Sequence, residues 1–400
     1  MKGLKTDMAK KKVENIETSG SIDFFGELDS ELKKEGSFNF SEFDDVQIKE
    51  TTGLDILDAI LASSEESRGF QLRTFNLFYG NSGSGKSTIL LQMAYSFIKN
   101  NEGQIIYYDG ESTLVGSKDR ITKLGIDEKR VKIIQQDTTV ENYYRLVNRI
   151  CNIRGKQLEQ YGEEYIMKNP IIVIVDSFTA LATEREIDSG TDINSALGTE
   201  AKLHSRLLKQ QINLLFKYNI TVLGIAQTRD TIQIGPTPKA KELLYTKQDI
   251  SIGGGNSLKF YSFYLVGMRT KKKLDESFGK DGGVEVELTL IKSKTSPAGK
   301  PITLIFFPTT GFSNLWTNFK IMQDSKVITN AGAYKAIPGY EKKFFTRDLE
   351  TLYNTDEEFR LNFDKQAKET LKTYIASIVP IEGLDESNKS LEMLAEDLDE

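Results

Sequence analysis

The 400-residue sequence has very little cysteine and histidine, with one residue of each, Cys151 and His204. A single cysteine cannot form an intrachain disulfide, and a single histidine cannot build a metal site from imidazoles. Long apolar runs are also missing: the longest aliphatic run, IIVIV at 171–175, is far shorter than the roughly 20 residues of a membrane-spanning helix. The first residues contain no apolar stretch typical of a signal peptide. These absences predict a protein of a reducing cytoplasm with no membrane partner.

The charge of the chain is unevenly distributed. The formal net charge is −6, which by itself argues against a nucleic-acid partner. Residues 382–400 contain eight acidic residues and one lysine, a net charge of −7, so that residues 1–381 carry +1. The sequence therefore predicts a near-neutral body with an acidic tail. Such a tail is either a frayed, solubilising C-terminus or a phosphate mimic that competes for a basic surface or recruits a partner.

Short aliphatic segments alternate with helix-like segments through the middle of the chain. Strands are predicted at 75–79, 104–109, 132–135, 171–176 and 221–226, and helices at 87–100, 202–218 and 356–377. Apolar strands joined by helices predict an α/β fold, with a mostly parallel twisted sheet covered on both faces. The alternating stretches SLKFYSFYLVGMR and VEVELTLIKS predict an antiparallel extension of that sheet. The expected regions are an arm (1–45), the α/β core (46–310), a small C-terminal α/β region (311–381) and the acidic tail (382–400).

The stretch YGNSGSGKST at 79–88 lies between a predicted strand and a predicted helix. From Gly80 to Ser87 it matches the spacing G-x-x-x-x-G-K-S, in which backbone N–H groups and a helix N-terminus converge on phosphate oxygens. Lys86 is expected to reach the β- and γ-phosphates, and the Ser87 hydroxyl to bind Mg²⁺. A chance glycine-rich turn is the alternative. The predicted nucleotide-binding residues are Gly80, Asn81, Ser82, Gly83, Ser84, Gly85, Lys86, Ser87 and Thr88.

Three further polar residues follow predicted strands. Asp176 ends the strand IIVIVD, where a carboxylate suits the hydration shell of Mg²⁺; an ordinary strand-terminal aspartate is the alternative. Glu111, in YYDGES, is placed to orient the water that attacks the γ-phosphate, whereas helix capping by Asp109 or Ser112 is the simpler account of this segment. Gln227, in GIAQ, is placed to contact the γ-phosphate and to report its presence to the following loop.

These four segments, followed by GGGNSLKF (253–260) and IKSKTSPAGKP (291–301), resemble the RecA family of recombinases. The resemblance covers about residues 50–307. The length, the FFGE segment and the acidic C-terminus look most similar to the recombinases of tailed phages. The resemblance implies a RecA-like P-loop ATPase core that uses ATP and Mg²⁺. It also implies DNA-dependent ATP hydrolysis and a helical filament that holds single-stranded DNA and pairs it with double-stranded DNA.

The resemblance also implies roles for individual residues. Glu111 corresponds to the catalytic carboxylate and Gln227 to the residue that couples nucleotide to DNA. Lys292 and Lys294 match a lysine pair that reaches the γ-phosphate of a neighbouring protomer, a role that would make hydrolysis depend on assembly. Solvated lysines on an edge strand are the alternative. The family's tyrosine against the adenine is missing, and Arg120 is the best-matching position.

Two loops and one basic cluster are expected to bind DNA. The first loop is 184–195 and the second is 228–253, a stretch long enough without predicted elements to suggest a function. The cluster RTKKK at 269–273 is expected to contact the incoming duplex, unless it is only a solvated hairpin turn. The predicted DNA-binding residues are Arg185, Arg229, Ile232, Ile234, Lys239, Lys241, Tyr245, Lys247, Arg269, Lys271, Lys272 and Lys273.

Phe24 and Phe25 stand in an otherwise polar arm, where two adjacent aromatics are expected to dock on a neighbouring protomer rather than on their own core. The tail is a candidate site for single-strand-binding and mediator proteins. Two other functions remain open. A hexameric helicase of the DnaB type would need an N-terminal helical domain that 45 polar residues cannot supply. A regulatory paralogue, or mediator, would bind ATP without catalysing strand exchange.

Overall fold

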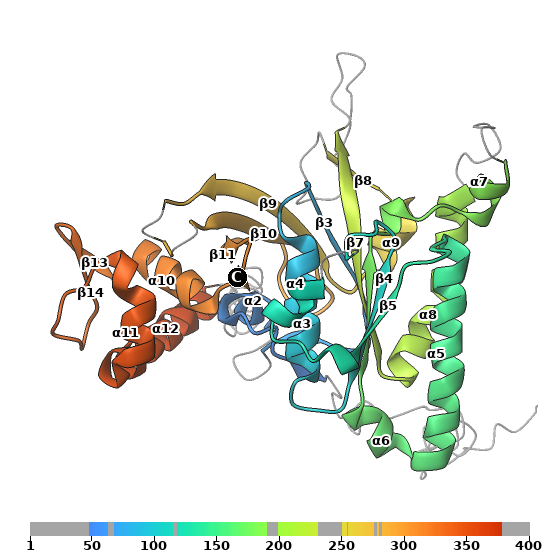
Figure 1. Cartoon of the computed structure of the whole chain (residues 1–400), viewed down its shortest axis with the longest axis horizontal. Helices are drawn as coiled ribbons and strands as arrows, with labels where there is room; N and C mark the ends of the chain where they lie inside the picture. The colour runs from blue at the N-terminus through green and yellow to red at the C-terminus, as the bar shows by residue number, and fades with distance from the viewer. Residues whose placement is uncertain are drawn as a thin grey trace, which may run out of the picture. The chain divides into compact units, whose positions relative to one another are not determined.

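A ten-stranded mixed sheet lies at the centre of the described structure (Figure 1). The computed structural model describes residues 48–62, 68–114, 118–189, 199–230, 250–253, 255–275, 278–279 and 282–377. The main strand order is β12-β11-β10-β9-β3-β7-β6-β4-β5, and β8 pairs with β7. The strands are β3 (Phe75–Gly80), β4 (Gln104–Asp109), β5 (Val131–Ile134), β6 (Ile171–Asp176), β7 (Ile220–Asp230), β8 (Ile250–Ile252), β9 (Leu265–Lys273), β10 (Val284–Lys292), β11 (Pro301–Phe307) and β12 (Gly311–Phe312).

The six strands from β9 to β5 are parallel, and β10, β11 and β12 extend the sheet in antiparallel fashion. This arrangement confirms the predicted α/β fold with an antiparallel extension. Because the carboxyl ends of neighbouring parallel strands meet at one edge, the segments that follow β3, β4, β6 and β7 lie together there. That edge carries the phosphate loop, Glu111, Asp176 and Gln227.

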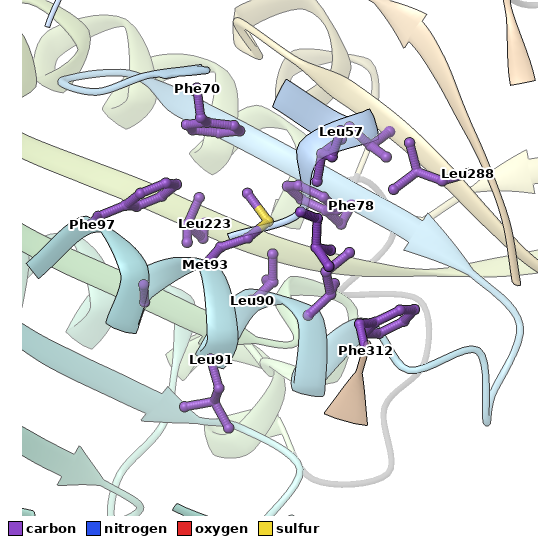
Figure 2. Packing of buried hydrophobic residues seen from close by; sticks show 14 of the residues in the cluster. Leu57, Phe70, Phe78, Leu90, Leu91, Met93, Phe97, Leu223, Leu288 and Phe312 are labelled. Carbon is purple, nitrogen blue, oxygen red and sulfur yellow. The ribbon is translucent and has the colours of Figure 1, made fainter. Parts of the chain in front are cut away.

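Helices cover both faces of the sheet. Along β6, Ile172 and Ile174 belong to one apolar cluster, and Val173 and Val175 belong to the other. Such alternation is expected for a strand that is buried on both faces. Figure 2 shows the first cluster, in which helix α3 packs against the sheet residues Phe78 and Leu223. The helices of this part are α2 (Asp55–Ile60), α3 (Lys86–Ile98), α4 (Lys118–Lys123), α5 (Val140–Tyr161), α6 (Glu163–Lys168), α7 (Glu184–Ser189), α8 (Thr199–Lys217) and α9 (Gly255–Tyr261).

The elements after β12 pack around a third apolar cluster, which includes Trp316, Phe319 and Phe359. They are α10 (Asn314–Asp324), β13 (Thr329–Ala331), β14 (Tyr334–Ala336), α11 (Leu349–Thr355) and α12 (Glu357–Ala376). Helix α12 confirms the helix predicted at 356–377. The short pair β1 (Lys49–Glu50) and β2 (Phe70–Gln71) precedes the main sheet. Within the described residues, no helix is long and apolar enough to cross a membrane.

Two details of the antiparallel extension differ from the prediction. The residues SLKFY are part of helix α9 and not of a strand, and the backbone N–H of Ser262, just past the helix, donates to the carbonyl oxygen of Leu258 at 3.2 Å, which is the i to i+4 bond of a helix. The basic cluster RTKKK lies within β9, paired with β10, so the alternative of a hairpin turn is wrong. Strand β10 lies between β9 and β11, but its pairing with β11 ends at Thr289, so Lys292 is paired only with Leu265 of β9 and the alternative of solvated lysines stays open.

Candidate nucleotide-binding site

The phosphate loop connects the end of β3 to the start of α3. Gly83 and Gly85 adopt φ values of 77° and 80°, in the left-handed region where a glycine avoids steric strain. A Cβ atom on Gly80 would lie 2.1 Å from the backbone oxygen of Met268 on β9. The loop can therefore turn this sharply and lie this close to β9 only because these three positions are glycines. Backbone N–H groups and the N-terminus of α3 are left to face an anion.

A cavity of about 700 Å³ opens above this loop. Its walls bring together the three strand-terminal residues singled out in the sequence, Glu111, Asp176 and Gln227. Phe306 and Pro308 also line it, from the end of β11 and the turn that follows. Among the described residues that line the cavity, Lys86 is the one cation. The phosphate-loop residues in its wall are Gly80, Asn81, Ser82, Gly83, Gly85, Lys86, Ser87 and Thr88.

Lys86 is held by its own loop. Its Nζ donates hydrogen bonds to the carbonyl oxygens of Gly80 at 2.9 Å and Asn81 at 2.8 Å. Burial lowers the pKa of Lys86, and the nearby carboxylates of Asp176 and Glu111 oppose that shift. A phosphate that entered the cavity would favour the ammonium form in the same way. Ser84, the remaining predicted loop residue, is buried and donates through Oγ to the carbonyl oxygen of Asn81 at 2.9 Å.

Asp176 and Ser87 form a pair of oxygen ligands suited to Mg²⁺. The Asp176 carboxyl is buried, which raises its pKa, whereas hydrogen bonds from Ser87 and Tyr107 lower it. The Tyr107 hydroxyl donates to Asp176 Oδ2 at 2.5 Å and fixes the orientation of the carboxylate. One hydroxyl and one carboxylate, with room for water in the cavity, match the hard oxygen donors that Mg²⁺ prefers. The residues present therefore fit the ion.

Glu111 faces the cavity because its neighbours fix the turn after β4. Asp109 is fully buried and accepts hydrogen bonds from the backbone N–H groups of Thr113 at 2.9 Å and Leu114 at 3.0 Å. Asp109 therefore holds the turn that follows β4 and does not cap a helix there, and Glu111 is left to meet other partners. Its Oε1 accepts a hydrogen bond from Gln227 Nε2 at 2.7 Å and another from the Ser177 hydroxyl. The expected catalytic carboxylate, Glu111, and the expected coupling residue, Gln227, are therefore in direct contact.

Lys292 and Lys294 do not line this cavity. Lys292 is opposite Leu265 on β9, and Leu265 is opposite Leu77 on β3, three residues before the phosphate loop begins. Lys292 therefore lies toward the other end of the strands. Its Nζ donates to the carbonyl oxygens of Lys259 and Phe260. Burial, with a contribution from the Lys294 ammonium, lowers the pKa of Lys292, and an additional anion would reverse that shift.

The basic cluster on β9 is partly neutralised. Glu287, on the paired strand β10, contacts two of its cations. Arg269 lies 2.6 Å from Glu287 Oε1, and Lys271 lies 3.1 Å from Glu287 Oε2. Lys272 and Lys273 are exposed on the same strand. Of the first proposed DNA loop, Arg185 lies in α7. The second proposed loop leaves the core along β7 and returns along β8, which pair antiparallel.

Several predicted residues cannot be placed at the level of side chains. Arg120 lies in α4 and Arg229 in β7, but their side chains are outside the described part of the structure. The following residues lie wholly outside the described residues: Phe24, Phe25, Ile232, Ile234, Lys239, Lys241, Tyr245, Lys247 and the acidic tail 382–400.

Three residues that shape the site were not predicted from the sequence. Tyr107 orients Asp176, and Thr228 on β7 donates to Asn81 Oδ1 at 2.8 Å. Thr179 bonds the backbone of Gln227. The two tyrosines in the strand QIIYYD were the available signal for Tyr107, but the pattern does not separate it from Tyr108. Nothing in the sequence pattern distinguishes Thr179, because Gln227 and Gly253, which it contacts, are distant along the chain.

The sequence of this chain is similar to those of known proteins. The RecA N-terminal domain family matches residues 41–313. The chain is 26% identical over 309 residues to the protein RecA of Malacoplasma penetrans, which covers 77% of this chain and 83% of that protein. It is 26% identical over 333 residues to the protein RecA of Borreliella burgdorferi, and this alignment covers 79% of this chain and 81% of that protein. It is also 28% identical over 299 residues to the protein RecA of Delftia acidovorans, and this alignment covers 74% of this chain and 71% of that protein. The chain therefore belongs to the RecA family.

Proposed function

We propose that this chain is a DNA-dependent ATPase and recombinase of the UvsX type. It would form filaments on single-stranded DNA and catalyse homologous pairing and strand exchange in recombination, repair and recombination-dependent replication. At the level of the family, RecA proteins hydrolyse ATP in a DNA-dependent manner and use Mg²⁺. The finer assignment rests on the length of the chain, its FFGE segment and its acidic C-terminus.

The observation that carries the proposal is that the candidate site is incomplete within one chain. An ATP molecule brings several negative charges, and the described cavity wall offers one cation, Lys86. The lysine pair Lys292 and Lys294 lies toward the opposite end of the strands. A second copy that places this pair over the cavity would supply the missing positive charge. The geometry thus supports a site shared between neighbouring protomers.

Each residue of the site has its own role in the proposed hydrolysis of ATP. Lys86 and the backbone N–H groups of the loop bind the β- and γ-phosphates. Ser87 and Asp176 supply oxygen ligands for Mg²⁺, which would offset negative charge on these phosphates. Glu111 orients the attacking water. Gln227, which bonds Glu111 at 2.7 Å, would exchange this bond for one to the γ-phosphate and so report nucleotide to β7 and the second DNA loop.

Electron microscopy of the protein with ATP and single-stranded DNA tests this function. We expect helical filaments, and we expect that deletion of residues 1–30 leaves a folded, ATP-binding monomer that does not form them, because the anchors Phe24 and Phe25 are lost. Closed rings would instead support a helicase of the DnaB type. If the micrographs show no rings and no filaments, that result would support a mediator that does not catalyse strand exchange. A truncated protein that polymerises normally would exclude the proposed role of the arm.

Deletion of residues 382–400 is expected to raise the affinity for duplex DNA. The segment carries −7 on a body of +1, and a tethered polyanion competes with DNA phosphates at high effective concentration. The gain should be on the order of threefold to tenfold at low salt and should shrink as salt screens the charges. The competition is proposed for the cluster at 269–273, and the same tail is a candidate site for single-strand-binding and mediator proteins.

The matched control is a tail of equal length in which every Asp and Glu is replaced by Asn or Gln. Titration of duplex DNA over a range of salt concentrations should give the same result for this variant as for the deletion. Equal affinities of all three proteins at low salt would contradict competition by the tail.

A further inference from the structure

A ring of hydrogen bonds joins the catalytic carboxylate to the base of the second DNA loop. Ser177 Oγ donates to Glu111 Oε1, and Thr179 Oγ1 lies 3.1 Å from Ser177 Oγ. The backbone N–H of Gln227 donates to Thr179 Oγ1 at 3.1 Å. The side chain of the same glutamine returns to Glu111 Oε1 at 2.7 Å. Thr179, Ser177 and Glu111 thus connect the backbone N–H of Gln227 to the side-chain amide of the same residue, and we call these four contacts the circuit.

The direction of each bond in this circuit is fixed by the number of hydroxyl hydrogens. An ionised carboxylate only accepts, so the single hydrogen of Ser177 goes to Glu111. The bond between the two hydroxyls must then use the hydrogen of Thr179. The Thr179 oxygen remains free to accept from the backbone of Gln227. Each hydroxyl is therefore used as both donor and acceptor, and loss of the Thr179 hydroxyl breaks two bonds at once.

Thr179 also touches the strand that returns from the second loop. The backbone N–H of Gly253, just after β8, donates to the carbonyl oxygen of Gln227 at 3.1 Å. A Cβ atom added to Gly253 would lie only 2.4 Å from Thr179 Cγ2. The methyl group of Thr179 is therefore packed against the backbone of Gly253. One side chain contacts the outgoing strand through its hydroxyl and the returning strand through its methyl.

We propose that Thr179 is a positioning residue that couples the second DNA loop to Glu111. A shift of the hairpin formed by β7 and β8 moves both contacts of Thr179, and the movement reaches the catalytic carboxylate through Ser177 and through Gln227. This inference rests on the proposed function, because it requires that DNA binds the loop between these strands. It adds a residue that does not line the described nucleotide cavity.

The first test replaces Thr179 by valine, which keeps the shape and removes the hydroxyl, and by serine, which keeps the hydroxyl and removes the methyl. The quantity measured is the ratio of DNA-stimulated to DNA-independent ATP hydrolysis. Thr179→Val should lower this ratio by about fivefold to tenfold, as expected for the loss of hydrogen bonds of ordinary strength. Thr179→Ser should stay within about twofold of wild type. A merely structural role would lower both rates together and leave the ratio unchanged, which would overturn the proposal.

The second test uses the packing contact. Gly253→Ala should force the returning strand away from Thr179 and lower the same ratio, because the added methyl group would lie 2.4 Å from Thr179 Cγ2. The double variant Thr179→Ser with Gly253→Ala removes the clash and should recover stimulation to within about twofold of Thr179→Ser alone. An unaffected Gly253→Ala protein, or a double variant without recovery, would overturn the proposal.

Failure of this inference can be distinguished from failure of the proposed function. If the wild-type protein shows no stimulation by single-stranded DNA, the proposed function is wrong. If the wild type is stimulated and Thr179→Val is stimulated equally, only the role of Thr179 is wrong. Thermal unfolding of each variant identifies any that has lost its fold. If Thr179→Val is one of these, the comparison of Thr179→Ser with the double variant Thr179→Ser and Gly253→Ala decides the question.

Discussion

Lys86→Ala is expected to lower the rate of ATP hydrolysis by on the order of 100- to 1,000-fold while the protein remains folded. The side chain supplies the one cation in the described wall of the cavity, so its removal takes away the positive charge that this chain itself places beside the transferring phosphoryl group. Its hydrogen bonds in this structure go to the carbonyl oxygens of Gly80 and Asn81. Both lie beside the cavity, where water can replace the ammonium group, so the fold should not depend on it.

The steady-state rate of phosphate release measures this effect, with and without single-stranded DNA. Lys129→Ala is a suitable control, because Lys129 is exposed and does not line the cavity. It changes the net charge equally and should hydrolyse ATP at the wild-type rate. Hydrolysis by Lys86→Ala near the wild-type rate would mean that the phosphate loop is not the site of the reaction.

Replacement of both Lys292 and Lys294 by alanine is expected to reduce DNA-stimulated hydrolysis by at least about 100-fold, the scale of a cation supplied in trans. Nucleotide binding by isolated protomers should stay nearly unchanged, because neither lysine lines the cavity of its own chain. Equilibrium binding of a fluorescent ATP analogue, measured without DNA, separates this outcome from a damaged site. Loss of binding in the isolated protomer would place the lysines in their own site and contradict the shared arrangement.

A mixing experiment tests the shared site directly. Protomers with both lysine substitutions retain Glu111, and Glu111→Gln protomers retain both lysines. In a mixed filament, some interfaces join an intact carboxylate to an intact lysine pair, so part of the activity should return. The matched control adds Glu111→Gln to the lysine variant on the same chain, and its mixtures with the lysine variant should stay inactive. With co-assembly verified by sedimentation on single-stranded DNA, an absence of recovery at every ratio would contradict catalysis in trans.

Several structural features followed from the sequence by itself. Strands β3, β4 and β6 lie where their aliphatic runs predicted, because a buried strand must be apolar on both faces. The bend of the phosphate loop was also predictable, since the φ values at Gly83 and Gly85 are ones that other residues rarely adopt. These features depend on neighbours in the chain and on local conformation. The fold class and the cluster of residues at the carboxyl edge followed from them.

Other features were decided only by the tertiary structure. The residues SLKFY alternate in a way that suits a strand, but they form α9, whose first residue, Gly255, packs against Ala201 on α8. Glu287 neutralises part of the basic cluster because strand register places it opposite Arg269. Register likewise carries Lys292 away from its own cavity, and folding brings Thr179 to Gln227 and Gly253. Each of these pairings joins residues far apart in sequence, and their geometry is fixed by how strands and helices pack, which no local pattern encodes.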